Sequence, residues 1–239
     1  ACKFMNLKSK VIEISGLTIQ NKKDMYGLMT KVYYGENWDK FLSDMSQKDY
    51  ALVLCNESSN IVGFTTIEIF DFEGKIIIYS GDTVIDENFR GDIELMRAWW
   101  RFSYTVQMKY HDKKVLWLLI SKGWRTYKFF PMFLKEIYPT YKYDTPKEIQ
   151  DFIDRLSVSK FGNCYKNGLV IPNEPDRLKS GENDIPEKRA GDYDVKFFLE
   201  KNPEFYKGNE LVCLAQLSIS NLTNAGLRLL HGKKGQNEE

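Results

Sequence analysis

Four cysteines are the most reactive side chains in this sequence. Cys2, Cys55, Cys164 and Cys213 are far apart and never form the close pairs typical of zinc sites or redox motifs. Cys55 and Cys213 lie in apolar runs, where a thiol packs as a small hydrophobic group. Cys164 lies in a polar turn and is therefore the one thiol to test as a nucleophile. No metal site is expected.

A second candidate site is the turn Arg90-Gly91-Asp92-Ile93, which precedes a long helical pattern. A helix N-terminus offers unpaired N–H groups and a positive dipole, and glycine lets a phosphate approach the backbone. This turn could therefore bind a phosphate group. The carboxylates of Asp92 and Glu94 suit the first turn of a helix but would repel that phosphate.

The spacing of apolar residues changes along the chain on either side of this turn. Three β-rich runs separated by polar turns predict an antiparallel meander, with strands at 50–55, 61–70 and 75–85. Residues 93–110 then show helical spacing, and 115–120 is a continuous apolar run typical of a strand buried on both faces. This order predicts that strands 75–85 and 115–120 are parallel.

Further elements flank this core. We expect a strand at 10–14 and helices at 22–34 and 38–45 before it. After it we expect an aromatic helix at 124–137 interrupted near Pro131, a helix at 146–156, strands at 168–171 and 210–217, and a helix at 221–230. The sequence thus predicts one α/β domain over 1–239 with a mixed sheet, a core at about 49–143 and a C-terminal extension at 144–239.

The chain runs from a strand that ends in Val84-Ile85, through a short turn with Phe89-Arg90-Gly91, to a long helix, a buried strand and a helix with a tyrosine. This order of elements resembles the core of the GNAT superfamily of N-acyltransferases over about 49–143. Arg90 and Gly91 match the family's turn, whereas Ile93 and Leu95 stand at its two later small positions. The resemblance implies splayed parallel strands after the meander, flanked by helices. It also implies transfer of an acyl group from acyl-CoA, or from another acyl-pantetheine thioester, to the amine of a small molecule or peptide.

The resemblance also implies site residues. The pantetheine arm would lie between the splayed strands and the pyrophosphate at the turn. The residues expected to bind the donor are then Thr83, Val84, Ile85, Arg90, Gly91, Asp92 and Ile93.

Proton transfer is expected from a tyrosine. Tyr127 comes six residues after Ser121, which matches the position of the family's proton donor to the leaving thiolate. The strand position that often carries a glutamate base falls near Tyr79. Asp82 and Glu68 could act through water, and the base stays unassigned.

Aromatic residues are dense on two predicted helices, at 99–104 and 127–133. In the family these helices lie on opposite faces of the sheet. Aromatic density is typical of core packing, but it also suits a tunnel for a medium or long acyl chain. Such a fatty acyl donor could be carried by acyl carrier protein, which presents pantetheine through a single phosphodiester.

Charge and composition bear on nucleic-acid binding and on membrane insertion. The net charge is +1, from 34 basic and 33 acidic residues, which argues against nucleic-acid binding. No apolar stretch approaches the roughly 20 residues that span a bilayer, so we expect a cytoplasmic protein with no membrane span. Two alternatives stay open: a GNAT-like binding module without turnover, and an unrelated α/β enzyme with its site near Cys164.

Overall fold

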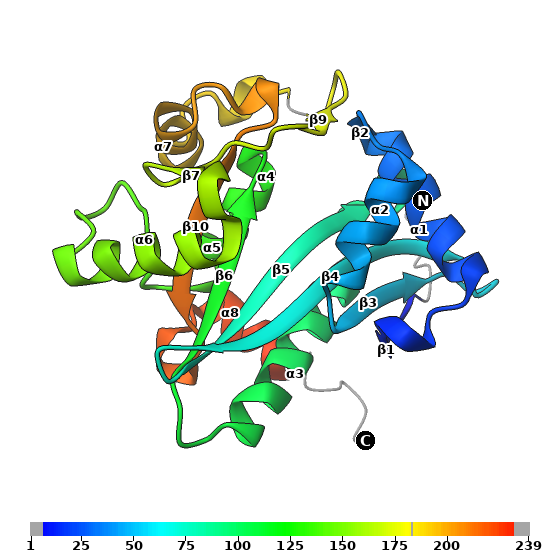
Figure 1. Ribbon diagram of the computed structural model, residues 1–239, viewed down its shortest axis with the longest axis horizontal. Helices are drawn as coiled ribbons and strands as arrows, with labels where there is room; N and C mark the ends of the chain where they lie inside the picture. The colour runs from blue at the N-terminus through cyan, green and yellow to red at the C-terminus, as the bar shows by residue number, and fades with distance from the viewer. Residues whose placement is uncertain (1–6, 183, 232–239) are drawn as a thin grey trace, which may run out of the picture.

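An eight-stranded sheet organises residues 7–182 and 184–231, the part of the chain that the computed structural model describes (Figure 1). Its strand order is β1-β3-β4-β5-β6-β10-β8-β7, and β2 pairs with β9 outside it. The strands are β1 (Lys8–Glu13), β2 (Tyr33–Tyr34), β3 (Tyr50–Cys55), β4 (Ile61–Phe72), β5 (Lys75–Ile85), β6 (Val115–Ser121), β7 (Tyr165–Lys166), β8 (Leu169–Val170), β9 (Arg177–Leu178) and β10 (Glu210–Gln216). The helices are α1 (Ile19–Val32), α2 (Trp38–Ser46), α3 (Glu94–Lys109), α4 (Trp124–Tyr127), α5 (Phe129–Phe133), α6 (Lys147–Phe161), α7 (Tyr193–Lys201) and α8 (Asn224–His231).

The predicted meander is confirmed, because β3, β4 and β5 are antiparallel neighbours. The turn between β4 and β5 is formed by Glu73 and Gly74, with φ of 51° and 73°. Positive φ at both central residues is what a type I′ hairpin turn requires, and the twist of this turn matches that of the flanking strands. β1 pairs with the outer edge of β3 and extends the meander by one strand.

The parallel pair is also confirmed. β5 and β6 are parallel neighbours, and α3 crosses from the end of one to the start of the other. Leu95, Trp99 and Val106 form part of the buried face of α3. β10 then pairs antiparallel with the far edge of β6, so that β6 is central and apolar on both faces, as its sequence predicts. The mixed α/β fold with a C-terminal extension is therefore confirmed.

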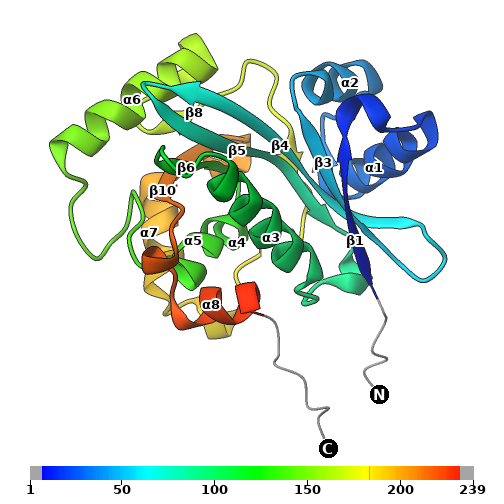
Figure 2. The ribbon, with the colours of Figure 1, turned by 90° about the horizontal axis from the view of Figure 1, so that it is seen from below.

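Helices cover both faces of the sheet (Figure 2). On one face, α1 and α2 pack against the meander, and α6 packs against the region around β6 and β10. On the other face lie α3, α5, α7 and α8. The expectation that the two aromatic helices lie on opposite faces is wrong. The ring of Trp117 lies 3.9 Å from that of Trp99 and 4.6 Å from that of Phe130, so both helices contribute to one core.

Two helical regions differ from the sequence predictions. The helix expected at 124–137 is two short helices that end at Phe133, with Pro131 at the centre of α5. Proline has no N–H to donate, so helix cannot continue undisturbed through it. α7 was not predicted. It begins at the N-cap Asp192, whose carboxylate accepts hydrogen bonds from two backbone amides, and buries Val195, Phe197 and Phe198.

Candidate functional site

β5 and β6 part in the middle of the sheet. Their registered pairs run from Ile76–Val115 to Ser80–Leu119, and beyond the last pair no ladder joins the two strands in the described part of the chain. β5 continues to Ile85 on β4, while β6 continues to Ser121 on β10. The two strands therefore enclose a V-shaped gap between residues 81–85 and 120–121, here called the inter-strand gap.

A β-bulge lies on β5 where this gap begins. Thr65 pairs with Thr83 and Ile67 with Ser80, so Gly81 and Asp82 together face the single residue Thr66. An extra residue on one strand bends that strand and increases its twist. The bulge thus turns β5 away from β6 at the point where their pairing stops.

A side chain at position 81 would displace its neighbours. A Cβ atom there would lie 2.5 Å from Oγ1 of Thr66 and 2.8 Å from Cε of Lys48. The side chain of Lys48 therefore crosses the bulge directly above the Gly81 backbone, in space that any other residue would fill.

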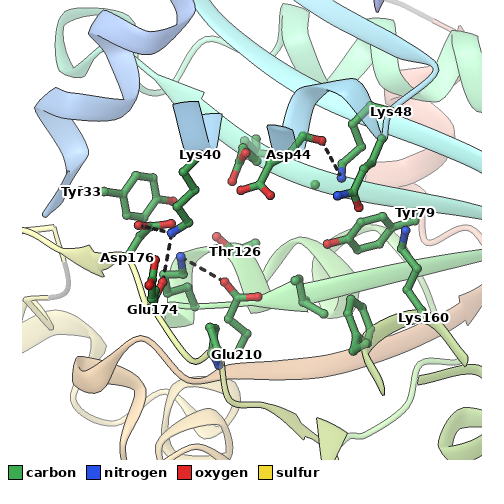
Figure 3. Close-up of a pocket in the computed structure, with 18 residues that line it drawn as sticks. Tyr33, Lys40, Asp44, Lys48, Tyr79, Thr126, Lys160, Glu174, Asp176 and Glu210 are labelled. Atoms are coloured by element: carbon green, nitrogen blue, oxygen red, sulfur yellow. Dashed lines mark hydrogen bonds and ion pairs between the residues drawn. The ribbon is translucent and has the colours of Figure 1, made fainter. Parts of the chain in front are cut away.

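A cavity of about 310 Å³ lies at the inter-strand gap, on the face covered by α1, α2 and α6 (Figure 3). We call it the charged cavity. Its walls come from β2, α2, β5, the end of β6, α4, α6, β10 and the segment before β9. The residues that line it are Tyr33, Lys40, Asp44, Gln47, Lys48, Tyr79, Gly81, Asp82, Thr83, Ile120, Lys122, Thr126, Lys160, Phe161, Pro172, Glu174, Asp176 and Glu210.

Three of the four lysines in this cavity are ion-paired. Lys40 lies 2.5 Å from Asp176, Lys122 lies 3.1 Å from Glu210, and Lys160 pairs with Glu68 behind the cavity wall. Lys48 has no carboxylate within ion-pair distance among the described residues, and neither Asp44 nor Asp82 has a cation there. Glu174 of the cavity wall has no ion pair either, so one positive and three negative side chains among the described lining residues are left for a ligand.

Burial shifts the acidity of several groups at this cavity. Burial, followed by the charge of Asp82, raises the pKa of Asp44 above its ordinary value, and burial lowers the pKa of Lys48. Burial and the adjacent Asp176 carboxyl raise the pKa of Glu36 to about 8. Burial also raises the pKa of Tyr79, so its hydroxyl stays protonated. Such shifts in one cleft are typical of a functional site.

Of the predicted donor-binding residues, Thr83 lines the charged cavity, and its neighbours continue along the gap. Val84 pairs with Phe64 of β4 and its side chain is buried in the core. Ile85 pairs with Gly63 and is half-buried.

The predicted phosphate turn comes after the gap and has found partners within the chain. Arg90 binds both carboxylate oxygens of Glu182 at 2.8 Å. Gly91 has a φ of 96°, and Asp92 accepts a hydrogen bond of 2.7 Å from the Glu94 amide at the start of α3. Ile93 is the N-cap residue and is exposed. A carboxylate of the chain itself thus already caps this helix N-terminus.

Tyr127, the predicted proton donor, does not line the charged cavity, although its neighbour Thr126 does. Its ring is fully buried near Phe197 and Phe198, and its hydroxyl donates a hydrogen bond to the Pro139 carbonyl at 3.0 Å. The structure does not bring it together with Thr83.

Cys164 is half-buried and packs against the apolar cluster beneath α6. No group of three His, Cys, Asp or Glu side chains within 7–182 and 184–231 is arranged to hold a metal ion. Within the same ranges, none of the helices has the length and apolar character that a membrane crossing needs.

Sequence reasoning missed most of the cavity. Asp44 and Lys48 belong to α2 and the residues after it, and Asp176 to the segment before β9, all outside the 49–143 core. Charged residues on a surface helix are normally solvated, so nothing in the sequence singled these out. Tyr79 stands at the position of the expected base. A phenol cannot act as a base near neutral pH, so its possible role as a proton donor was not considered.

No protein-family model and no curated protein sequence matches the chain. Among solved structures, it is similar to a GNAT family N-acetyltransferase from Escherichia coli in complex with CoA, at 10% identity over 51% of this chain and 66% of that one, with a TM-score of 0.38. It is similar to an acetyltransferase from Trypanosoma brucei at 16% identity over 63% and 91% of the two chains, with a TM-score of 0.35. A probable N-acyltransferase from Enterococcus faecalis matches at 11% identity over 64% and 43%, with a TM-score of 0.40. The first of these three is described as a GNAT family protein, and at these identities and TM-scores the likenesses assign neither a family nor a function to this chain.

Proposed function

We propose that this protein is an N-acyltransferase that moves an acyl group from acyl-CoA to a primary amine. The parting of β5 and β6 beyond Ser80 and Leu119 carries this proposal. It leaves strand edges whose N–H and C=O groups can pair with the amides of a pantetheine arm, next to a cavity with unpaired carboxylates. In this proposal Thr83, Val84 and Ile85 supply the β5 edge.

Donor phosphates would bind at the turn formed by Arg90, Gly91, Asp92 and Ile93. Because the Asp92 carboxylate already caps α3, we assign phosphate binding to the guanidinium of Arg90, which would exchange Glu182 for the donor. Acyl carrier protein presents only one phosphodiester and is the alternative donor.

The chemistry needs three proton transfers. The amine enters as an ammonium ion bound by Asp44 and Asp82, and Asp44 accepts one proton because burial raises the pKa of its carboxyl. The amine nitrogen then attacks the thioester carbon, and the carbon–sulfur bond breaks. Tyr79 donates its phenolic proton to the departing thiolate, and the second proton of the attacking nitrogen passes to the tyrosinate, which leaves an amide, a free thiol and a neutral Tyr79. Tyr79 is preferred to Tyr127 because it lines the cavity next to the last residue of the paired ladder.

The acyl group is proposed to be short. The aromatic side chains that suggested a long acyl chain pack against one another: Trp99 stacks on Trp117, and Trp100 contacts Phe133 edge-on. These rings are accounted for by the core, and the charged cavity is too polar to bind a hydrocarbon chain.

Turnover with acetyl-CoA tests the proposal. The protein is incubated with acetyl-CoA and a panel of primary amines, while thiol release and product mass are followed. We expect amine-dependent thiol release together with an acylated product. Binding of CoA without any product would identify a binding module, and turnover that needs Cys164 but not Tyr79 would identify the unrelated enzyme.

A further inference from the structure

The charges left unpaired in the charged cavity indicate what kind of acceptor it binds. Lys48, Asp44, Asp82 and Glu174 have no ion-pair partner among the described residues, whereas Lys40, Lys122 and Lys160 each have one. An unpaired charge in a partly buried site costs free energy, which a ligand of opposite charge recovers. The unpaired lysine and carboxylates are therefore complementary to a ligand that carries one anionic and one cationic group.

These positions follow an order along the cavity (Figure 3). Lys48, Tyr79 and Lys160 stand at one end, Asp44 lies between, and Asp176 and Glu174 lie at the other end. The Lys48 ammonium lies 5.2 Å from the centre of the Tyr79 ring, and that of Lys160 lies 5.0 Å from it. Glu68 neutralises Lys160, so Lys48 supplies the unpaired positive charge at this end.

Tyr79 adds a polar group to this end. The residue is 6% exposed, and its hydroxyl points into the cavity (Figure 3). A phenolic hydroxyl at a cavity wall can donate a hydrogen bond to a polar atom of a bound molecule, or accept one from it. Gly81 contributes as well, because it leaves the space through which the Lys48 side chain reaches this position.

We infer that the acceptor is an amino acid or an equally small zwitterion, whose carboxylate binds Lys48 and whose amine lies between Asp44 and Asp82. This inference rests on the proposed function and names the substrate class of the same site. A polyamine would place an ammonium against Lys48, and an amino sugar would leave Lys48 unpaired. The cavity volume of about 310 Å³ is at the lower end of the range for small-molecule sites and suits a free amino acid.

The sharpest test compares each amino acid with its carboxamide, which keeps the amine and removes the negative charge. With acetyl-CoA as donor, we expect kcat/KM to be at least about tenfold higher for the amino acid, since losing a charge-assisted hydrogen bond costs about 1.5–3 kcal/mol. Lys48→Met should reduce that ratio to about 1, and Lys48→Arg should retain it. Lys23→Met, which changes an exposed lysine on α1, should leave it unchanged.

Other outcomes separate the two claims. Transfer to carboxamides or to a polyamine such as spermidine as fast as to amino acids would overturn the zwitterion assignment and leave the acyltransferase intact. Transfer to none of these amines would contradict the proposed function. Calorimetry of the amino acid and its carboxamide with the CoA-loaded protein then still decides the ligand class, and equal affinities would overturn the assignment.

Discussion

The indole nitrogen of Trp117 donates a hydrogen bond of 2.9 Å to the hydroxyl of Ser80, the last residue of β5 that pairs with β6. Trp99 donates a second bond of 3.2 Å to the same hydroxyl. Ser80 is 2% exposed, so neither indole can turn to water instead. One small hydroxyl thus fixes two core rings beneath the start of the inter-strand gap.

Ser80→Ala should destabilise the protein. It leaves two buried indole N–H groups without an acceptor, and we expect the free energy of unfolding in urea to fall by about 2 kcal/mol. In a Trp117→Phe background only one donor is stranded, so the same change should cost less. An equal cost in both backgrounds would show that the hydrogen bonds do not account for the effect.

Gly81→Ala should impair acyl transfer more than it impairs folding. The new methyl group meets Thr66 Oγ1 and displaces the Lys48 side chain, so we expect kcat/KM to fall at least about tenfold through a loss of roughly 1.5 kcal/mol in transition-state binding. Gly27→Ala on α1 is the control, because no atom lies within 4 Å of its added Cβ. This control should raise the free energy of unfolding by about 0.5–1 kcal/mol. Full activity in Gly81→Ala would contradict the proposal that the Lys48 side chain binds the acceptor from its position above Gly81.

Tyr79→Phe should lower kcat about 100-fold, the usual effect of removing a general acid. Tyr127→Phe removes a hydrogen bond to the Pro139 carbonyl and should mainly reduce stability, with kcat almost unchanged. Steady-state rates and urea unfolding of both variants separate these effects. If Tyr127→Phe were the inactive variant, the spacing argument from sequence would be right and the cavity argument wrong.

Stability should fall as pH rises from about 5 to 8. Burial and Asp176 raise the pKa of Glu36 to about 8 in the folded state, above its value in the unfolded chain. The folded protein therefore binds more protons than the unfolded chain in this window, and its advantage is lost as pH rises through the folded pKa. Glu36→Gln should flatten this part of the curve of unfolding free energy against pH. Glu57→Gln, in an exposed turn, should not, and a Glu36→Gln curve as steep as the wild type would refute the assignment.

The fold could be predicted from sequence where local signals decide it. The polar turns and β-rich runs from Tyr50 to Ile85 set the meander, and the change to helical spacing after Arg90 marked the crossover to β6. These signals depend on neighbouring residues only. α7 was not predicted from the sequence. Its strongest signal is the apolar group around Phe197, which packs against Tyr127, a residue 70 positions earlier in the chain.

The candidate site could be predicted only in part. The resemblance to the GNAT core implied a gap beside Thr83, and the pairing of β5 with β6 does stop at Ser80. The charged residues around the gap could not be predicted. Asp44, Asp176 and Glu210 line one cavity only because elements that are distant in the sequence pack together. Tyr127 had the expected spacing, but spacing does not say which way a side chain points.

Backbone amide hydrogen exchange, with and without acetyl-CoA, tests most directly whether the inter-strand gap binds a pantetheine thioester. Amides of residues 76–80 are already within the β5–β6 ladder and should change little. Those amides at 82–85 and 120–121 that face the gap, and not β4 or β10, should become protected when the donor binds. Protection confined to other parts of the chain, or none at saturating acetyl-CoA, would contradict the account.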